Sequence, residues 1–429
     1  MPTPTDLEAG PIHPDELVPL PGDLGATPLP EAGFEADDPG SQRAAAGPAP
    51  TADVRRAYLG QAVIGYAIYA VGAVSAFLAV ALSLSDTQAG LHSSALAAGI
   101  AVAGLSGDRL DARLGPRAVH LAGLALLGAG GIMLVWAPAF AVTLAAAAAI
   151  GLGSGLLLGH INQTLSAGGG ALARVRLARS TLIAMFASLS VPLVIGAGIA
   201  IELGWQLVVV PALALVVLAV VASRGRLARS VGTETARVRL PRAYWLAWAL
   251  VALVVAVEFA MVFWGSSLVE RQTGIPLGDA TLVLAAFFVG MIAGRSALSA
   301  HAVSRHDPIW LMRAGISLAL LGSLLPLVPA SVPLSVVGLF LGGSGVGLLF
   351  PLGASISLAA VPGHARQAAS RLVIASGLAI LAAPFVLGVV ADAAGVIVGW
   401  LLIPAICLAA LGLSVPVARA TDQGRPKTA

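Results

Sequence analysis

Long apolar runs separated by short polar breaks fill the chain from about residue 55 onward. A helix that crosses the hydrocarbon core of a bilayer needs about 20 predominantly apolar residues, and the runs have about this length. We therefore predict an all-α integral membrane protein with twelve spans, near residues 57–82, 91–106, 118–136, 139–160, 180–200, 203–223, 243–267, 279–297, 311–329, 333–356, 371–391 and 395–417. The second and eighth runs are short, so we expect each helix to continue into the loop that follows.

The basic residues test this count, because they collect in the cytoplasmic loops of membrane proteins. In the predicted topology they fall before the first span, after the even-numbered spans and at the C-terminal end, and only Arg271 lies on the other side. This alternation predicts a multi-pass protein of the cytoplasmic membrane whose N- and C-termini are both cytoplasmic.

Composition agrees with this picture. Hydrophobic residues make up 58% of the 429 residues, charged residues 10%, and the mean hydropathy is +0.93. A soluble domain usually has about 25% charged residues. The single cysteine, Cys407, lies in an apolar run, and we interpret it as a small buried hydrophobic residue.

The charge is unevenly distributed along the chain. Residues 1–54 have ten acids and one base, Arg43, and are rich in Pro, Gly and Ala. Such a segment buries too little apolar surface to fold, so we predict a disordered acidic cytoplasmic tail. It also lacks the basic and apolar segments of a signal peptide. The other predicted domains are an N-terminal six-helix bundle at 55–223, a basic cytoplasmic linker at 224–242, a C-terminal six-helix bundle at 243–418 and a cytoplasmic tail at 419–429.

An internal repeat relates the two predicted bundles. A shift of 192 residues superimposes seven glycine, arginine and proline positions: Gly151, Gly153, Gly155, Arg174, Arg179, Pro192 and Gly196 coincide with Gly343, Gly345, Gly347, Arg366, Arg371, Pro384 and Gly388. Six spans separate equivalent positions, and six is an even number. The two bundles therefore have the same orientation in the membrane, as in transporters built from parallel repeats.

The polar segment after the second span carries a recognisable signature. It matches the loop signature of major facilitator superfamily transporters, with the first half at Gly104, Asp108 and Arg109 and the second half at Arg113, Gly115 and Arg117. Gly115 follows Arg109 by six residues instead of two, which adds about one helical turn. Either Asp108 or Asp111 can therefore occupy the family's acidic position. Segments 258–264, 290–295 and 343–351 also resemble bacterial members with unassigned substrates.

This resemblance implies the major facilitator fold and alternating access, in which two six-helix bundles rock about a central site. It also implies a gating role for the signature charges, which in the family pair across the bundle interface and latch the outward-facing state. Arg179 and Arg371, at matched positions before spans five and eleven, are candidate partners for Asp108 or Asp111. The alternative is that these basic residues only set the topology.

Candidate substrate- and proton-binding residues lie inside the spans. Glu258 is an acid deep in an apolar run, and ionisable residues at such positions usually bind a solute or a proton, although a structural hydrogen bond is the alternative. Tyr66 coincides with Glu258 under the 192-residue shift, and Tyr69 lies three residues further along the same helix. We expect both tyrosines to line the cavity opposite Glu258, or else to pack. Trp264 is expected at the membrane interface.

His160 and Asn162, with Gln163, end the fourth span on the cytoplasmic side. They are candidates for an inner gate or for substrate contact, and hydrated helix ends are the alternative. The chain has no His or Cys set with metal-ligand spacing, so we expect no metal. It has no phosphate-binding loop with an ATP-site lysine, so we expect no cofactor and an ion gradient, of protons, as the energy source.

We therefore expect a symporter that moves a small organic solute. Span five keeps Pro192 and Gly196 but lacks the Gly-Pro pair and double glycine of drug antiporters, and a proton-driven exporter of drugs or metabolites is the alternative within the family. A transport-inactive membrane sensor is the alternative from another class. An enzyme would need converging polar groups that the spans lack. The expected partners are the solute and the lipid bilayer, with no nucleic acid and no ATPase subunit, and the protein is expected to be a monomer.

Overall fold

The computed structural model describes residues 51–136, 139–167, 170–223, 238–298, 306–361 and 364–423. These residues belong to one compact unit, residues 35–429. The predicted acidic tail up to residue 50, residues 224–237 of the predicted linker and the last six residues lie outside the described residues, as do the side chains of Arg174 and Arg366.

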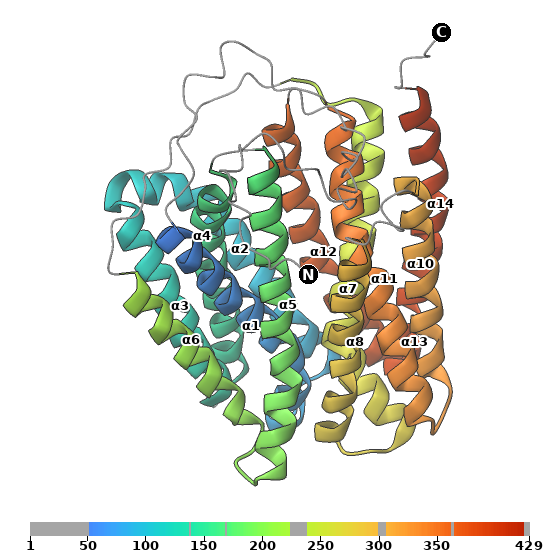
Figure 1. The fold of residues 1–429 in the computed structure, drawn as a ribbon. Coiled ribbons are helices and arrows are strands. Elements are labelled where there is room, and N and C mark those ends of the chain that lie inside the picture. Colours follow the sequence, from blue (N-terminus) through green and yellow to red (C-terminus); the bar gives the residue numbers. More distant parts are fainter. Residues whose placement is uncertain are drawn as a thin grey trace, which may run out of the picture. The chain divides into compact units, whose positions relative to one another are not determined.

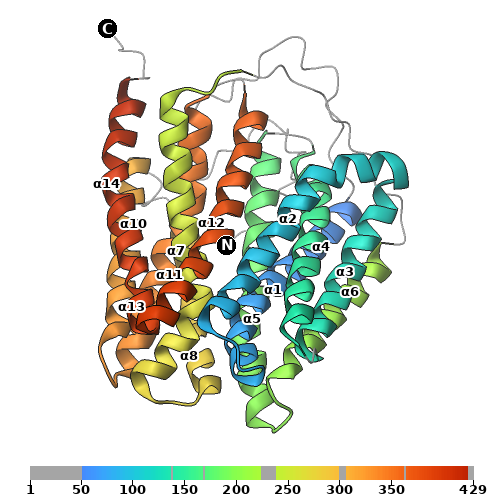
Figure 2. The same ribbon diagram turned by 180° about the vertical axis from the view of Figure 1, so that it is seen from behind.

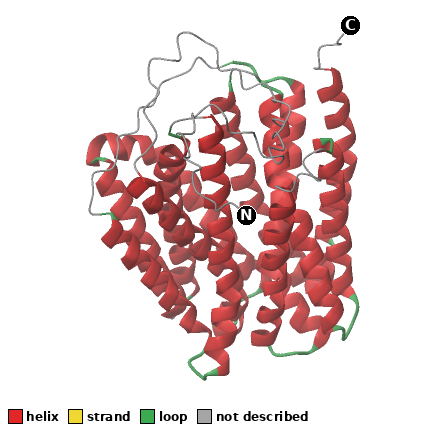
Figure 3. Cartoon of the chain, viewed as in Figure 1, coloured by secondary structure: helices red, strands yellow, loops and turns green. Residues whose placement is uncertain are grey.

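The described part of the chain is helical, and the figures show long helices that run side by side (Figures 1 and 3). The N-terminal half consists of α1 (Thr51–Ala81), α2 (Asp86–Leu114), α3 (Pro116–Trp136), α4 (Phe140–Ser166), α5 (Gly170–Ala200), the short helix η2 (Trp205–Val208) and α6 (Val209–Ala222). The C-terminal half consists of α7 (Arg242–Thr273), α8 (Leu277–Leu298), α10 (Pro308–Leu324), η3 (Leu325–Leu327), α11 (Val332–Ala359), α12 (Ala365–Ala394), α13 (Val396–Trp400) and α14 (Leu402–Gln423).

Twelve helical segments of the described chain are long and apolar enough to cross a membrane, which confirms the predicted number of spans. Several of their ends differ from the prediction; α5, for example, begins at Gly170 and not at residue 180. Helix α1 begins at Thr51, inside the predicted tail. The predicted last span is divided into α13 and α14 at Leu401. The signature segment belongs to α2, which continues to Leu114 and ends where Gly115 adopts a φ of 84°. This backbone conformation is easily reached only by glycine.

The repeat found in the sequence is confirmed by the helix boundaries. Helices α3 and α10 begin at Pro116 and Pro308, which are 192 residues apart, and α4 and α11 begin at Phe140 and Val332. The two halves also share a helix crossing. An added Cβ at Gly151 in α4 would overlap the Leu96 carbonyl of α2, and one at its equivalent, Gly343 in α11, would overlap the Phe287 carbonyl of α8. Small residues allow such backbone contact between membrane helices.

The two halves meet mainly through α2 with α12, α5 with α8, and α1 with α7. In Figure 2, α2 and α12 approach each other near the centre of the view. Their contact involves the N-terminal part of α2 and the C-terminal part of α12. Ser94 donates a hydrogen bond to the Leu381 carbonyl at 2.6 Å. An added Cβ at Gly90 would lie 2.7 Å from the Pro384 carbonyl oxygen.

The faces of α2 and α12 that meet at Ser94 and Leu381 are exposed toward the C-terminal end of α2 and the N-terminal end of α12. Leu105 lies 11 residues after Ser94, or about three helical turns, and therefore on the same face of α2. It is 80% exposed. Ile374, on the corresponding face of α12, is 50% exposed. The halves are thus joined at one end of the α2–α12 seam and separate toward the other end, where α2 ends and α12 begins.

Candidate functional site

Glu258 lies near the midpoint of α7, in the run that the sequence analysis singled out, and is 8% exposed. A buried carboxylate is costly unless it receives hydrogen bonds or faces a positive charge. The Tyr69 hydroxyl of α1 donates a hydrogen bond to Glu258 Oε1. Since α1 belongs to the N-terminal half and α7 to the C-terminal half, this hydrogen bond joins the two halves at the centre of the molecule.

Aromatic rings fix the position of the Tyr69 side chain. Its ring stacks on Phe259, with the centroids 5.9 Å apart and the planes 17° from parallel. The edge of Phe288 in α8 meets it at 5.3 Å and 85°. Both arrangements are favourable for aromatic pairs. The hydroxyl is therefore held toward Glu258 by packing that does not depend on the carboxylate.

A basic residue from a third helix completes this cluster. Arg295 in α8 interacts electrostatically with Glu258 and with Tyr69. Its Nε donates a hydrogen bond to the Gly347 carbonyl of α11 at 3.2 Å. Arg295 thus provides a countercharge for an ionised Glu258. We call Tyr69, Glu258 and Arg295, with the rings of Phe259 and Phe288, the central cluster.

Tyr66 does not join this cluster. Its side chain is 1% exposed, and its hydroxyl donates to the Val208 carbonyl of η2 at 2.8 Å. Positions three residues apart on a helix differ by about 60° in direction, which is enough for the two tyrosines to meet different partners. Tyr66 therefore ties α1 to η2 inside the N-terminal half, and only Tyr69 faces Glu258.

The expectation that Trp264 lies at the membrane interface is wrong. Trp264 is 3% exposed, and its indole Nε1 donates to the Pro384 carbonyl of α12 at 3.0 Å. Pro384 cannot donate a backbone hydrogen bond and interrupts the hydrogen bonding within α12. The carbonyl left without its intrahelical donor is that of Ile380, four residues earlier, so the Trp264 bond to Pro384 is a separate contact that ties α7 to α12.

A second polar cluster lies inside the N-terminal half. His160 Nε2 in α4 is 2.8 Å from Asp111 Oδ2 in α2, so the fourth span and the signature segment are directly bonded. The ring of His120 in α3, which is 5% exposed, lies 6.3 Å from that of His160. His120 Nε2 also lies 3.1 Å from Ser223 Oγ, at the end of α6.

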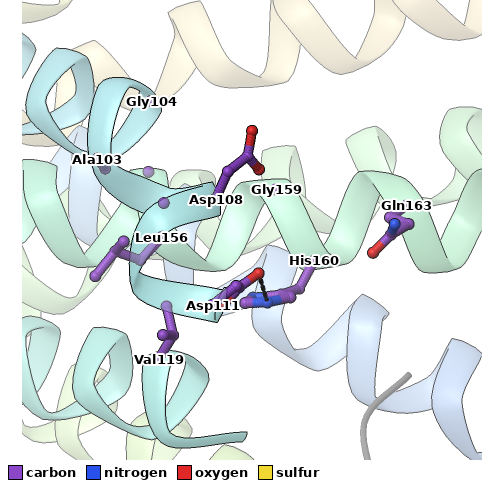
Figure 4. A pocket seen from close by; sticks show the side chains of 11 residues that line it. Ala103, Gly104, Asp108, Asp111, Val119, Leu156, Gly159, His160 and Gln163 are labelled. Carbon is purple, nitrogen blue, oxygen red and sulfur yellow. Dashed lines mark hydrogen bonds and ion pairs between the residues drawn. The ribbon is translucent and has the colours of Figure 1, made fainter. Parts of the chain in front are cut away.

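A cavity of about 180 Å³ adjoins this second cluster (Figure 4). It is lined by residues of α2, α3 and α4: Ala103, Gly104, Gly107, Asp108, Asp111, Val119, Gly155, Leu156, Gly159, His160 and Gln163. In Figure 4, Asp111 points toward His160, whereas the Asp108 carboxylate points away from this pair. The two acids of the signature segment therefore have different environments.

The remaining signature charges are on the surface. Asp108, Arg109, Arg113 and Arg117 are exposed, as is Asn162. The two predicted gate partners, Arg179 and Arg371, are exposed too. In the described part of the chain neither arginine forms a salt bridge with Asp108 or Asp111. The structure instead pairs Asp111 with His160, a contact that residue spacing alone does not predict.

The described residues contain no group of three or more His, Cys, Asp or Glu side chains that could hold a metal ion. The absence of a metal and of a cofactor stays a prediction. The central cluster offers one carboxylate, one guanidinium and one phenol, and these groups can exchange a proton or bind the polar part of a solute.

Comparison with known proteins identifies the fold. No family model matches the chain, and no curated protein matches its sequence. Solved structures match over most of their length. A bacterial homologue of the human lysosomal transporter Spinster, in an inward-facing and occupied conformation, is 13% identical, with a TM-score of 0.66 over 88% of this chain and 98% of that chain.

Two further structures give the same result. The nucleoside transporter NupG is 15% identical, with a TM-score of 0.67 over 86% of this chain and 98% of that chain. The E. coli fucose:proton symporter FucP is 17% identical, with a TM-score of 0.57 over 86% and 99%. The chain thus has the fold of membrane transporters, and none of these three structures is an enzyme. The major facilitator fold, expected from the signature segment, is confirmed.

Proposed function

We propose that the protein is a secondary active transporter that moves a small organic solute by alternating access and is coupled to protons through Glu258. The observation that carries this proposal is the hydrogen bond between Tyr69 and Glu258, which joins the two halves beside Arg295. Solved transporters with this fold include a nucleoside transporter and a fucose:proton symporter. The proposed location is the cytoplasmic membrane, with both termini in the cytoplasm.

The central cluster supports a simple coupling step. An ionised Glu258 needs a donor and a countercharge, and Tyr69 and Arg295 supply them. A protonated Glu258 is neutral and becomes a donor itself, so it no longer requires the Tyr69 hydroxyl. Proton binding therefore weakens a contact between the two halves. This links the charge of one residue to the relative movement of the halves.

The open end of the α2–α12 seam lies on the side of the arginine-rich segments. With the proposed orientation this side is the cytoplasm, and the structure is inward-facing. A solute would then leave the central cluster toward the cytoplasm after Glu258 has lost its proton. This order of steps describes a symporter, and an exporter would use the same conformations in the opposite direction.

The test is transport by purified protein in proteoliposomes. Nucleosides, short peptides and hexoses are the first solutes to screen, because solved transporters of this fold act on such compounds. For a solute that is transported, Glu258→Gln should abolish accumulation driven by a proton gradient but retain exchange of labelled for unlabelled solute. Glu270→Gln, on the same helix, is the matched control and should behave as wild type. Proton-driven accumulation by Glu258→Gln at the wild-type rate would refute the coupling role.

A further inference from the structure

The N-terminus of α2 is capped by a residue of the other half. Asp392 in α12 accepts two backbone hydrogen bonds, at Oδ1 from the Asp86 N–H at 2.7 Å and at Oδ2 from the Thr87 N–H at 2.9 Å. The first N–H groups of a helix have no partner within the helix. A carboxylate is favoured there because the N-terminus of a helix carries partial positive charge.

The local sequence of α2 leaves these two N–H groups free for Asp392. Ser85 and Gln88 form a capping box, in which the Gln88 N–H donates to Ser85 Oγ at 3.2 Å and the Ser85 N–H donates to Gln88 Oε1 at 3.0 Å. The box gives hydrogen-bond partners to the N–H groups of Ser85, which precedes the helix, and of Gln88, its third residue. Asp392 gives partners to the N–H groups of the first and second residues. The capping of α2 is therefore complete only while the two halves are in contact.

Close packing holds the Asp392 carboxylate in place. An added Cβ at Gly388, one turn before Asp392, would overlap the Asp86 carbonyl oxygen. Further along the seam, Gly90 packs against the Pro384 carbonyl, and Ser94 bonds to Leu381. The two backbones are in direct contact over this stretch, so a small separation of the halves breaks both hydrogen bonds of Asp392.

The equivalent seam between α5 and α8 has no such cap. Under the 192-residue shift, Asp86 corresponds to Gly278 and Asp392 corresponds to Ala200. Alanine has no acceptor in its side chain. The contact there is apolar: an added Cβ at Gly278 would lie 2.7 Å from Ile199 Cδ1. The charged cap is thus a feature of the α2–α12 seam and is not imposed by the repeat.

We propose that Asp392 is a latch that holds this end of the transporter closed, an inference that rests on the proposed alternating access. Opening of this end breaks both hydrogen bonds, and water then solvates the two N–H groups and the carboxylate. Because the contact at the equivalent end of the α5–α8 seam is apolar, the latch belongs to the α2–α12 seam alone. With the proposed orientation it is an extracellular gate.

Distances between spin labels measure the two ends of the seam separately. Cysteines at Ala81 and Ala394 report on the latched end, and cysteines at Leu105 and Ile374 report on the open end; these four residues are exposed. The buried Cys407 is first replaced by alanine. In the conformation described here the pair at the open end gives the longer separation. In the opposite conformation this pair shortens and the pair at the latched end lengthens.

Two variants remove the latch from opposite sides. Asp392→Ala removes the acceptor. Asp86→Pro removes one donor but fits the helix, because proline is favoured at the first helical position and Ser85 already has the extended backbone that precedes proline. Each variant should raise the ratio of the opposite conformation to this one by about tenfold, which corresponds to about 1.4 kcal/mol. Agreement between the two excludes an effect specific to one substitution.

One control variant, Asp279→Asn, alters the acid in the first turn of α8 and should leave both distances unchanged. Asp86→Asn keeps the N–H donor but removes the carboxylate, which interacts with Arg271 and Asp392 of the other half. It measures the charge contribution that Asp86→Pro also includes, so its shift should be smaller than that of Asp86→Pro. Wild-type distances in both Asp392→Ala and Asp86→Pro, or an equal shift in Asp279→Asn, would overturn the latch. If labelled wild-type protein never changes either distance under a proton gradient with a transported solute, alternating access itself fails. If the wild type changes conformation but the variants leave the ratio of the two conformations unchanged, only the latch is rejected.

Discussion

Tyr69→Phe isolates the hydrogen bond between the two halves. The substitution removes the hydroxyl that donates to Glu258, but it keeps the ring that stacks on Phe259 and meets Phe288. Any change in the balance of conformations should therefore come from the hydrogen bond and not from a loss of packing. Tyr58→Phe, on the same helix, is the matched control.

The magnitude follows from the kind of hydrogen bond. A hydrogen bond to a charged group contributes about 1.5–3 kcal/mol. If it forms only in the conformation described here, its loss lowers the population of this conformation relative to the opposite one by roughly 10- to 150-fold. Tyr58→Phe should leave the ratio within about twofold of wild type, since surface or partly buried changes without a partner cost little.

The measurement is the distance between spin labels at Leu105 and Ile374, in a double-mutant cycle with Glu258→Gln. Because the hydroxyl acts on the carboxylate, its removal should have a smaller effect in the Glu258→Gln background than in wild type. Equal effects of Tyr69→Phe in both backgrounds would show that the hydroxyl acts elsewhere. An unchanged distance distribution in Tyr69→Phe would refute the stabilising role of this hydrogen bond.

Three further predictions concern packing, the second polar cluster and topology. Gly151→Val should lower the thermal unfolding temperature in detergent by several degrees, because the side chain would overlap α2, whereas Gly159→Ala, with open space around it, should not. Asp111→Asn and His160→Gln should each loosen α2 against α4, measured as faster hydrogen exchange at the C-terminal end of α2, and the double variant should exchange no faster than either single one. Tags between the first and second spans should be accessible from outside the cell, and tags in the predicted linker only from inside.

The fold could be predicted from the sequence because lipid imposes a simple rule. Every span must be long, apolar and helical, so the polar breaks mark the helices without knowledge of their packing. The short second run predicts that its helix continues into the charged signature segment, and α2 does so, ending at Leu114. One exception has a local cause. The last span contains a break at Leu401 that its apolar sequence does not reveal.

The central cluster could be predicted only in part. Glu258 stands out because it is an acid inside an apolar run, and Tyr69 followed from its helical position relative to Tyr66. Phe259 and Phe288 have no signal that separates them from other apolar residues of the spans. Arg295 lies near the end of the predicted eighth span, where a basic residue is expected for topology alone. Which tyrosine reaches Glu258 depends on a rotation of about 60°, which spacing along the sequence does not resolve.

The length of α2 has a mechanical consequence. Its 29 residues form a rod about 43 Å long, at 1.5 Å per residue. The residues capped by Asp392 are at one tip, and the Asp111 contact to α4 is near the other. A rod pivoting near its middle moves its tips in opposite directions, so this single helix can transmit events at one membrane face to the other without any change in its own internal structure.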